Sequence, residues 1–153
     1  MKSMFILFSY FLITISSSEA NSDDHTVLCR TCGMDIADPQ HLKVSSTSPF
    51  YLERQNVTMF GSKLRIPIEQ LENPAGIEFR VVTFTKAGCI GVGDWTSEAS
   101  WYPGYLWKVC VCPHCQIQLG WMFEPKDTAV KELLKPSDAG FYAVIVKNVF
   151  ELL

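Results

Sequence analysis

Short alternating runs and continuous apolar runs dominate the chain. Residues 63–68 alternate polar and apolar side chains, and residues 78–84 and 106–111 are rich in β-branched and aromatic residues. Both patterns are typical of strands. Residues 141–150 form a longer apolar run, which we expect to be a closing strand buried on both faces. The pattern therefore predicts a mostly β single domain, built from two antiparallel sheets.

Turn-forming residues separate the predicted strands. Asn73-Pro74-Ala75-Gly76 predicts a turn before residues 78–84, and three glycines within residues 88–94 predict a second turn region. Residues 128–134 predict a short helix, which Pro136 would end.

The first residues are typical of a targeting segment. Lys2 precedes an apolar stretch over residues 4–15, and Ser18-Glu19-Ala20 suits signal peptidase cleavage after Ala20. The stretch is shorter than the roughly 20 apolar residues that span a bilayer. A membrane anchor or a buried helix is the alternative. We expect a signal peptide over residues 1–20, a flexible polar tail over residues 21–27 and the folded domain over residues 28–153, in a secreted, extracellular protein.

The charge and composition of the chain restrict the classes of partner that it can bind. The chain has 13 basic and 16 acidic residues and no basic stripe, which argues against binding to nucleic acid. Polar residues break the apolar C-terminal segment, so no later membrane span and no membrane partner are expected. Asn56-Val57-Thr58 is a candidate N-glycosylation site, usable only in the secretory pathway.

Four cysteines occur as two CxxC pairs, Cys29/Cys32 and Cys112/Cys115. Four thiolates satisfy the tetrahedral preference of Zn²⁺ and leave no coordination position for water or substrate. A metal that joins such distant segments also restricts the unfolded chain. We therefore predict a structural zinc ion. Two disulfides or a redox-active CxxC are the alternatives.

The two remaining cysteines, Cys89 and Cys110, form an even pair in a predicted secreted chain. A disulfide between them is one hypothesis, and two buried thiols that act as small apolar side chains are the other.

Three tryptophans, Trp101, Trp107 and Trp121, flank the second cysteine pair. Because that pair predicts a chain reversal, the rings can converge on one side of a hairpin, and Phe123 would share their face if its segment is a strand. An aromatic box of this kind holds a small flat ring or a cationic ammonium group. The alternative is that the three indoles are simply core.

The same segment closely resembles the CULT domain family, the thalidomide-binding module of cereblon. The likeness rests on residues 98–107, 112–115 and 120–123, and it extends to residues 29–32, 73–76 and 86–87. It covers nearly all of the chain after the predicted signal peptide. The sequence looks like a secreted single-domain branch of that family.

The resemblance implies a β-tent fold, with two antiparallel sheets pinned by zinc, and it implies a ligand site. Cys29, Cys32, Cys112 and Cys115 match the zinc ligands of the family. In the family the pocket accepts glutarimide and related cyclic imides. The matching pocket residues are Trp101, Trp107 and Trp121 as cage walls, Phe123 at the floor, and Asn73 and Pro74 in the turn over the ligand.

One position departs from the family pattern. Ala99 stands where cereblon has a histidine that contributes to imide recognition. The backbone groups of Ala99 and Trp101 can still offer an acceptor and a donor. Loss of one side-chain hydrogen bond costs on the order of 0.5–1.5 kcal/mol, or up to roughly tenfold in affinity.

The resulting hypothesis is a secreted, zinc-stabilised binding module, not an enzyme, whose tryptophan cage holds a cyclic imide or a similar flat ring. A methionine-R-sulfoxide reductase is a competing enzyme hypothesis, but it needs a cysteine near the C-terminus, and none follows Cys115. Two further hypotheses are a cage for methylated ammonium groups and an interaction domain without a small ligand.

Overall fold

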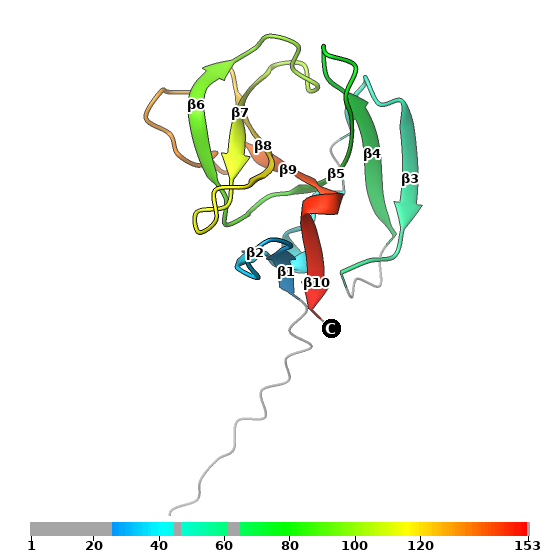
Figure 1. Cartoon of the computed structure of the whole chain (residues 1–153). Coiled ribbons are helices and arrows are strands. Elements are labelled where there is room, and N and C mark those ends of the chain that lie inside the picture. Colours follow the sequence, from blue (N-terminus) through cyan, green and yellow to red (C-terminus); the bar gives the residue numbers. More distant parts are fainter. Residues whose placement is uncertain (1–25, 45–46, 61–64, 153) are drawn as a thin grey trace, which may run out of the picture.

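The computed structural model describes residues 26–44, 47–60 and 65–152, and nearly all regular structure in them is β (Figure 1). The predicted signal peptide lies outside the described residues, as do residues 21–25 of the predicted tail. Residues 26 and 27 were assigned to that tail incorrectly. The first strand already begins at Thr26, and Val27 is fully buried.

The strands form two antiparallel sheets, which confirms the predicted fold class. Figure 1 shows the larger sheet divided by its twist, with β6, β7 and β8 on one side, β3 and β4 on the other, and β5 and β9 crossing between them. Its order is β3 (Glu53–Val57), β4 (Ile66–Glu72), β5 (Glu78–Phe84), β9 (Phe141–Ile145), β8 (Gln118–Pro125), β7 (Tyr105–Val111), β6 (Ile90–Thr96).

The smaller sheet has the order β10 (Val149–Leu152), β1 (Thr26–Cys29), β2 (Asp35–Ala37) and lies below the larger one in Figure 1. Two short 3₁₀ turns, η1 (Pro39–His41) and η2 (Val146–Asn148), complete the fold. The first and last strands pair directly, with Thr26 opposite Leu152. No helix within the described residues is long and apolar enough to cross a membrane.

The predicted strands over residues 78–84 and 106–111 correspond to β5 and to all but the first residue of β7. The strand predicted over residues 63–68 is shifted, because β4 begins at Ile66 and continues to Glu72, while residues 63 and 64 lie outside the described residues. The predicted turn at residues 73–76 is confirmed: the Asn73 side chain accepts the backbone N–H groups of Ala75 and Ile77.

The apolar run 141–150 is not one strand, which corrects the prediction. It is β9, then η2, then β10, and the two strands belong to different sheets. Long-range hydrogen bonds hold the break: the Arg30 guanidinium donates to the carbonyls of Lys147 and Val149, and the side-chain amide of Asn148, within the break, donates to the backbone carbonyl of Gln118. The pattern of apolar residues cannot predict hydrogen bonds between segments that are distant in the sequence.

Two further predictions were wrong. Most of the predicted turn 88–94 belongs to β6, where Gly93 has φ 79° beside a register shift between Val92 and Thr96. The glycines there mark a bulged strand. The predicted helix 128–134 is a series of turns, because the Lys108 ammonium and the Trp95 indole bind the carbonyls of residues 130, 131 and 133.

The core lies on both faces of the large sheet. Phe84, Met122 and Val144 belong to a cluster that joins this sheet to the small one. Phe123 and Phe141 belong to a second cluster, together with two of the tryptophans. A disulfide joins Cys89, just before β6, to Cys110 on β7, with their Cα atoms 5.6 Å apart, so the two are not free buried thiols.

Candidate functional site

The four CxxC cysteines meet where the small sheet approaches the β7–β8 hairpin. The Sγ atoms of Cys29 and Cys115 are 3.7 Å apart, those of Cys32 and Cys112 are 3.6 Å apart, and all four lie within 4.8 Å of one another. A tetrahedral ion with Zn–S bonds of about 2.3 Å has its sulfurs about 3.8 Å apart. The donor set therefore fits Zn²⁺.

The two turns that carry these cysteines have the same backbone geometry. The carbonyl of Cys29 accepts the N–H of Gly33, and the carbonyl of Cys112 accepts the N–H of Gln116. Gly33 and Gln116 both have positive φ, 73° and 63°. Each turn directs two thiols to one point, so two distant segments each supply half of the four-thiol cluster.

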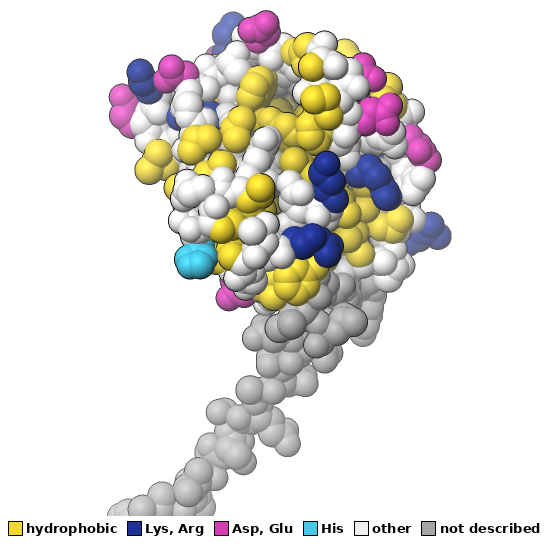
Figure 2. Space-filling model, in the orientation of Figure 1, with side chains coloured by type: hydrophobic (Ala, Val, Ile, Leu, Met, Phe, Trp, Pro, Cys, Tyr) yellow, Lys and Arg dark blue, Asp and Glu magenta, His cyan; other side chains and the backbone are white. Residues whose placement is uncertain are grey.

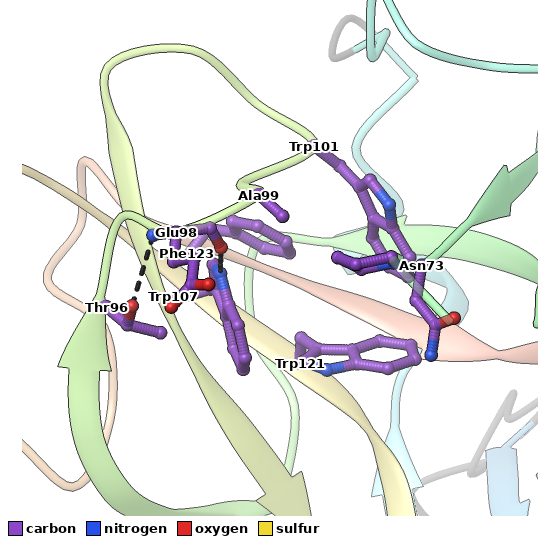
Figure 3. A pocket seen from close by; sticks show the side chains of 9 residues that line it. Asn73, Thr96, Glu98, Ala99, Trp101, Trp107, Trp121 and Phe123 are labelled. Carbon is purple, nitrogen blue, oxygen red and sulfur yellow. Dashed lines mark hydrogen bonds between the residues drawn. The ribbon is translucent and has the colours of Figure 1, made fainter. Parts of the chain in front are cut away.

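A pocket of about 340 Å³ opens on the large sheet, between the β6–β7 loop and the β4–β5 turn. Figure 3 shows the three indoles standing around it. All seven predicted ligand-binding residues line it: Asn73, Pro74, Ala99, Trp101, Trp107, Trp121 and Phe123. Thr96 and Glu98 also line it, although no sequence motif assigned them there and the available signal was only their nearness to the tryptophans.

The β7–β8 pairing places the aromatic side chains on one face. Trp107 lies opposite Phe123, and Val109 lies opposite Trp121, so these side chains project from the same side of the hairpin. Trp101 comes from the β6–β7 loop and meets Trp121 edge to face, with ring centroids 4.7 Å apart. The indoles thus converge from a strand pair and a loop, as predicted.

Hydrogen bonds fix two of the three indoles. The Trp101 Nε1–H donates to the carbonyl of Glu72 at 2.8 Å, which ties the loop to the end of β4. The Trp107 Nε1–H donates to the carbonyl of Glu98, also at 2.8 Å. These two rings are therefore held in place at their polar edges.

A buried carboxylate supports the loop that carries Trp101. The Glu69 carboxylate, 2% exposed, accepts the N–H of Ser48 and the hydroxyl of Tyr102. The Ser48 hydroxyl then donates to the Trp101 carbonyl at 2.6 Å. Burial raises the pKa of Glu69 against the opposing effect of its donors, and burial together with the Glu69 charge raises the pKa of Tyr102.

This supporting network was missed at the sequence level. The available signal was a glutamate between Ile68 and Leu71 in a segment rich in apolar residues, but nothing local connects it to residues 48 and 102. Its partners are 21 and 33 residues away along the chain. Only the folded sheet brings them together.

One edge of the pocket offers polar backbone groups. Ala99 has φ 50°, an uncommon conformation for a non-glycine residue, often found at functional sites. Among the described residues, no hydrogen bond engages the carbonyl of Ala99 or the N–H of Trp101. An acceptor and a donor therefore remain available beside the indoles.

The alternative in which the tryptophans are only core is half right. Trp101 and Trp121 are 8% and 9% exposed, and one side of this pair packs against Phe79. Trp107 is partly buried. Each ring nevertheless lines the pocket, so the same residues belong to the core and to the site. The sequon residue Asn56 lies elsewhere, exposed on β3.

Comparisons with known proteins agree with the resemblance. No protein-family model matches the chain. Cereblon of Danio rerio, Xenopus tropicalis and Gallus gallus matches it with 33%, 34% and 33% identity over 79 residues. The match covers 51% of this chain and 17% of each relative, so it spans less than a fifth of their length. The chain carries a cereblon-like CULT domain.

Proposed function

We propose that this cereblon-like CULT domain is a binding module whose tryptophan cage holds a cyclic imide or a similar small flat ring. One observation carries the proposal. Three indoles, two of them anchored through their N–H groups, surround an open pocket with an unengaged carbonyl and N–H at its edge, as far as the described residues show. The carbonyl of Ala99 can accept the N–H of an imide, and the N–H of Trp101 can donate to the neighbouring imide carbonyl.

Recognition follows from these groups. The indole faces exclude water from both sides of the ring, the Ala99 carbonyl accepts the imide N–H, and the Trp101 N–H donates to an imide carbonyl. The volume of about 340 Å³ lies at the small end of the range for ligand pockets, about 300–1,000 Å³, which favours a single ring.

Binding without chemical conversion is part of the proposal. Among the described residues that line the pocket, Glu98 is the sole ionisable side chain. Nucleophilic catalysis by a serine, cysteine or lysine side chain would need such a residue in the lining, and the described lining has none. The zinc ion would be structural, because its four thiolate ligands fill a tetrahedral shell away from the cage.

We further propose that the protein is secreted and carries a glycan at Asn56. Two features support this. The disulfide between Cys89 and Cys110 is typical of oxidising compartments, and Asn56 is exposed on strand β3, where a glycan would be accommodated. Digestion with an amidase that removes N-glycans, followed by mass spectrometry of protein recovered from the medium of expressing cells, tests both statements.

Titration followed by tryptophan fluorescence tests the cage. We expect glutarimide and succinimide to quench the emission, and Trp107→Ala to weaken binding by about 30-fold or more, the effect of a binding hot spot. Trp95→Ala is the matched control, because Trp95 binds the Val130 carbonyl and does not line the pocket. Zinc content should be equal in all three proteins.

The imide proposal fails if the unmutated protein shows no response at millimolar imide. It also fails if Trp107→Ala and Trp95→Ala bind imide equally well, because the indole of Trp107 would then not be a cage wall.

A methylated ammonium ligand is the second candidate, favoured by the Glu98 carboxylate beside the three indoles. Calorimetry with choline and with succinimide separates the two. Glu98→Gln should weaken choline binding and leave succinimide binding unchanged, whereas no heat with choline would remove this candidate.

A further inference from the structure

The strand β3 forms one outer edge of the large sheet, and β6 forms the other. Figure 1 shows these two strands at opposite sides of the molecule. The first four residues of β3, from Glu53 to Asn56, are exposed. An open edge strand can pair with a strand of another chain, so proteins usually cover or interrupt such edges.

The edge at β6 is both covered and interrupted. The N–H of Gly91 donates to the carbonyl of Leu134 at 2.9 Å. The Trp95 indole donates to the carbonyl of Val130. Both carbonyls belong to the connection between β8 and β9, which Figure 1 shows in orange beside β6. The bulge around Gly93 also breaks the regular edge, so the fold itself protects this side of the sheet.

The hydrogen bonds of β4 show which of its backbone groups face β3. The N–H of Asn73 donates to the carbonyl of Ile77 where β4 turns into β5, so the odd-numbered residues of β4 face β5. The even-numbered residues of β4 therefore face β3. The Gln70 carbonyl accordingly accepts the N–H of Leu52, just before β3.

The same alternation sets the direction of the backbone groups of β3. Glu53 lies opposite Gln70, so the backbone groups of Glu53 and, two residues later, of Gln55 face β4. The backbone groups of Arg54 and Asn56 then point away from β4, toward the outside of the sheet.

This outer edge of β3 has open backbone groups. Among the residues that the structure describes, β3 pairs with β4 alone. The Arg65 guanidinium donates to the Asn56 carbonyl at 2.6 Å, and no other hydrogen bond of the described chain engages the outward groups of Arg54 and Asn56. A backbone carbonyl has two lone pairs, so the Asn56 carbonyl can accept a second donor. The edge can therefore pair with an added strand.

The surroundings of this edge suit a second copy of the same chain. Glu53 and Arg54 carry opposite charges. Figure 2 shows acidic, basic and apolar side chains mixed on the right of the molecule, where Figure 1 places β3. Two copies therefore do not meet there with a single sign of charge. The exposed residues Phe50, Tyr51 and Leu52 precede β3 and add apolar surface beside the edge.

The candidate glycosylation site lies within this edge. In a symmetric antiparallel pair that engages both outward residues of each copy, Arg54 of one copy lies opposite Asn56 of the other. A glycan on Asn56 is bulky and would stand at this contact in both copies. Glycosylation and pairing of the edge therefore exclude each other.

We propose that an N-glycan on Asn56 covers the open edge of β3 and keeps the protein monomeric, and that the unglycosylated edge pairs with β3 of a second copy. This inference rests on the glycan proposed above and gives that glycan a function. The acceptor residue lies on the outer strand of the large sheet that the described part of the fold leaves uncovered.

Substitutions at Thr58 test the proposal without changing Asn56. Thr58→Ala destroys the acceptor sequence, whereas Thr58→Ser is the matched control that keeps it. The proteins are secreted from the same cells and compared by sedimentation velocity at increasing concentration. We expect Thr58→Ser to remain monomeric like the unmutated protein, and Thr58→Ala to double its mass as the concentration rises.

A second pair of variants, made in the Thr58→Ala protein, tests the strand edge. The N–H of Arg54 points outward, so Arg54→Pro removes an edge donor without removing a hydrogen bond to β4. Arg54→Pro should restore the monomer, whereas Arg54→Lys keeps the N–H and the charge and should remain dimeric. If the proline variant does not fold, hydrogen exchange decides: the Arg54 and Asn56 amides should exchange more slowly in the Thr58→Ala dimer than in the diluted monomer.

A Thr58→Ala protein that stays monomeric at every concentration would overturn the inference and leave the proposed glycan intact. A dimer that a folded Arg54→Pro variant retains, or in which the two amides exchange as fast as in the monomer, would also overturn it, because another surface would then form the contact. If the unmutated protein carries no glycan, the proposed modification itself fails. Imide binding should be equal in all variants, because neither Arg54 nor Thr58 lines the pocket.

Discussion

The β7–β8 hairpin serves two sites that are built in opposite ways. At its tip, Cys112 and Cys115 meet two other thiols within 4.8 Å, and the space between them suits one ion. Along its strands, Trp107 and Trp121 face an open pocket. The four thiols share one centre, whereas the indoles of Trp101 and Trp107 donate to two different carbonyls, so these two walls of the cage are held at separate points.

The difference separates the structural role expected of the cysteine cluster from the role of the hydrogen bonds that hold the indoles. A metal bound by the four thiolates would set the relative position of the two sheets, whereas single hydrogen bonds hold two of the indoles on one sheet. Separate perturbations of the two ends can break or refine this division, beginning with the metal.

Removal of the metal should have the largest effect. Structural zinc contributes about 10–16 kcal/mol of apparent binding energy in small zinc modules at neutral pH. We therefore expect Cys112→Ser, or treatment with a strong chelator, to abolish the cooperative thermal transition and imide binding together. Circular dichroism and fluorescence titration measure the two. A chelated protein that still melts cooperatively and binds imide would break the comparison, because the cage would not need the metal end.

Loss of the disulfide should have a smaller effect, on stability alone. The Cys89–Cys110 bridge spans 21 residues, for which chain entropy gives a stabilisation of about 3 kcal/mol. Cys89→Ser/Cys110→Ser should lower the free energy of unfolding in urea by that amount. Imide affinity at 25 °C should stay the same, because neither cysteine lines the pocket. A large loss of affinity in folded protein would show that the bridge shapes the cage.

Glu69 should make the free energy of unfolding depend on pH, separately from any effect of the metal. Burial raises its pKa above 4.5, so the native state holds this proton more tightly than the unfolded state. The free energy of unfolding should therefore fall as pH rises from about 4.5 through the raised native pKa. Glu69→Gln should remove this contribution.

The measurement is the difference in free energy of unfolding between the two proteins from pH 4 to 7. Thiolate protonation at the metal cancels in this difference. A difference that does not change with pH would show that the pKa of Glu69 is the same in the native and unfolded states.

Ala99→His should have the smallest effect, which is a moderate increase in the affinity of the cage for an imide. Histidine is enriched at positive φ, so it suits the backbone at this position, and it can add one hydrogen bond to an imide. We expect imide affinity to rise by up to about tenfold. Ala99→Leu is the control that adds bulk without a donor. Equal affinities in both variants would show that the side chain at this position does not contact the ring.

Features that depend on neighbouring residues in the sequence were predicted, whereas features that depend on contacts between distant residues were not. The metal centre and β5 follow from short, local patterns, namely CxxC spacing and β-branched alternation. The cage residues came from tryptophan positions and from a resemblance to a family, and the structure gathers all seven around one pocket.

The failures were long-range. The break at residues 146–148 depends on Arg30, more than 110 residues earlier in the chain, and the turns at residues 128–134 depend on Lys108 and Trp95. In each case a distant side chain binds carbonyls that the local pattern assigns to a strand or a helix. The Glu69 network likewise forms only in the folded domain, because its partners Ser48 and Tyr102 are distant in the sequence.

The pairing of β1 with β10 has a consequence for biosynthesis. A sheet that joins the first strand to the last cannot form until the ribosome has released nearly the whole domain, so Cys29 waits for partners that emerge more than 80 residues later. Contacts of such high sequence separation slow folding. Until those segments emerge, Cys29 and Cys32 lack the other two thiols of the cluster, so the four-thiol site is among the last features of the domain to form.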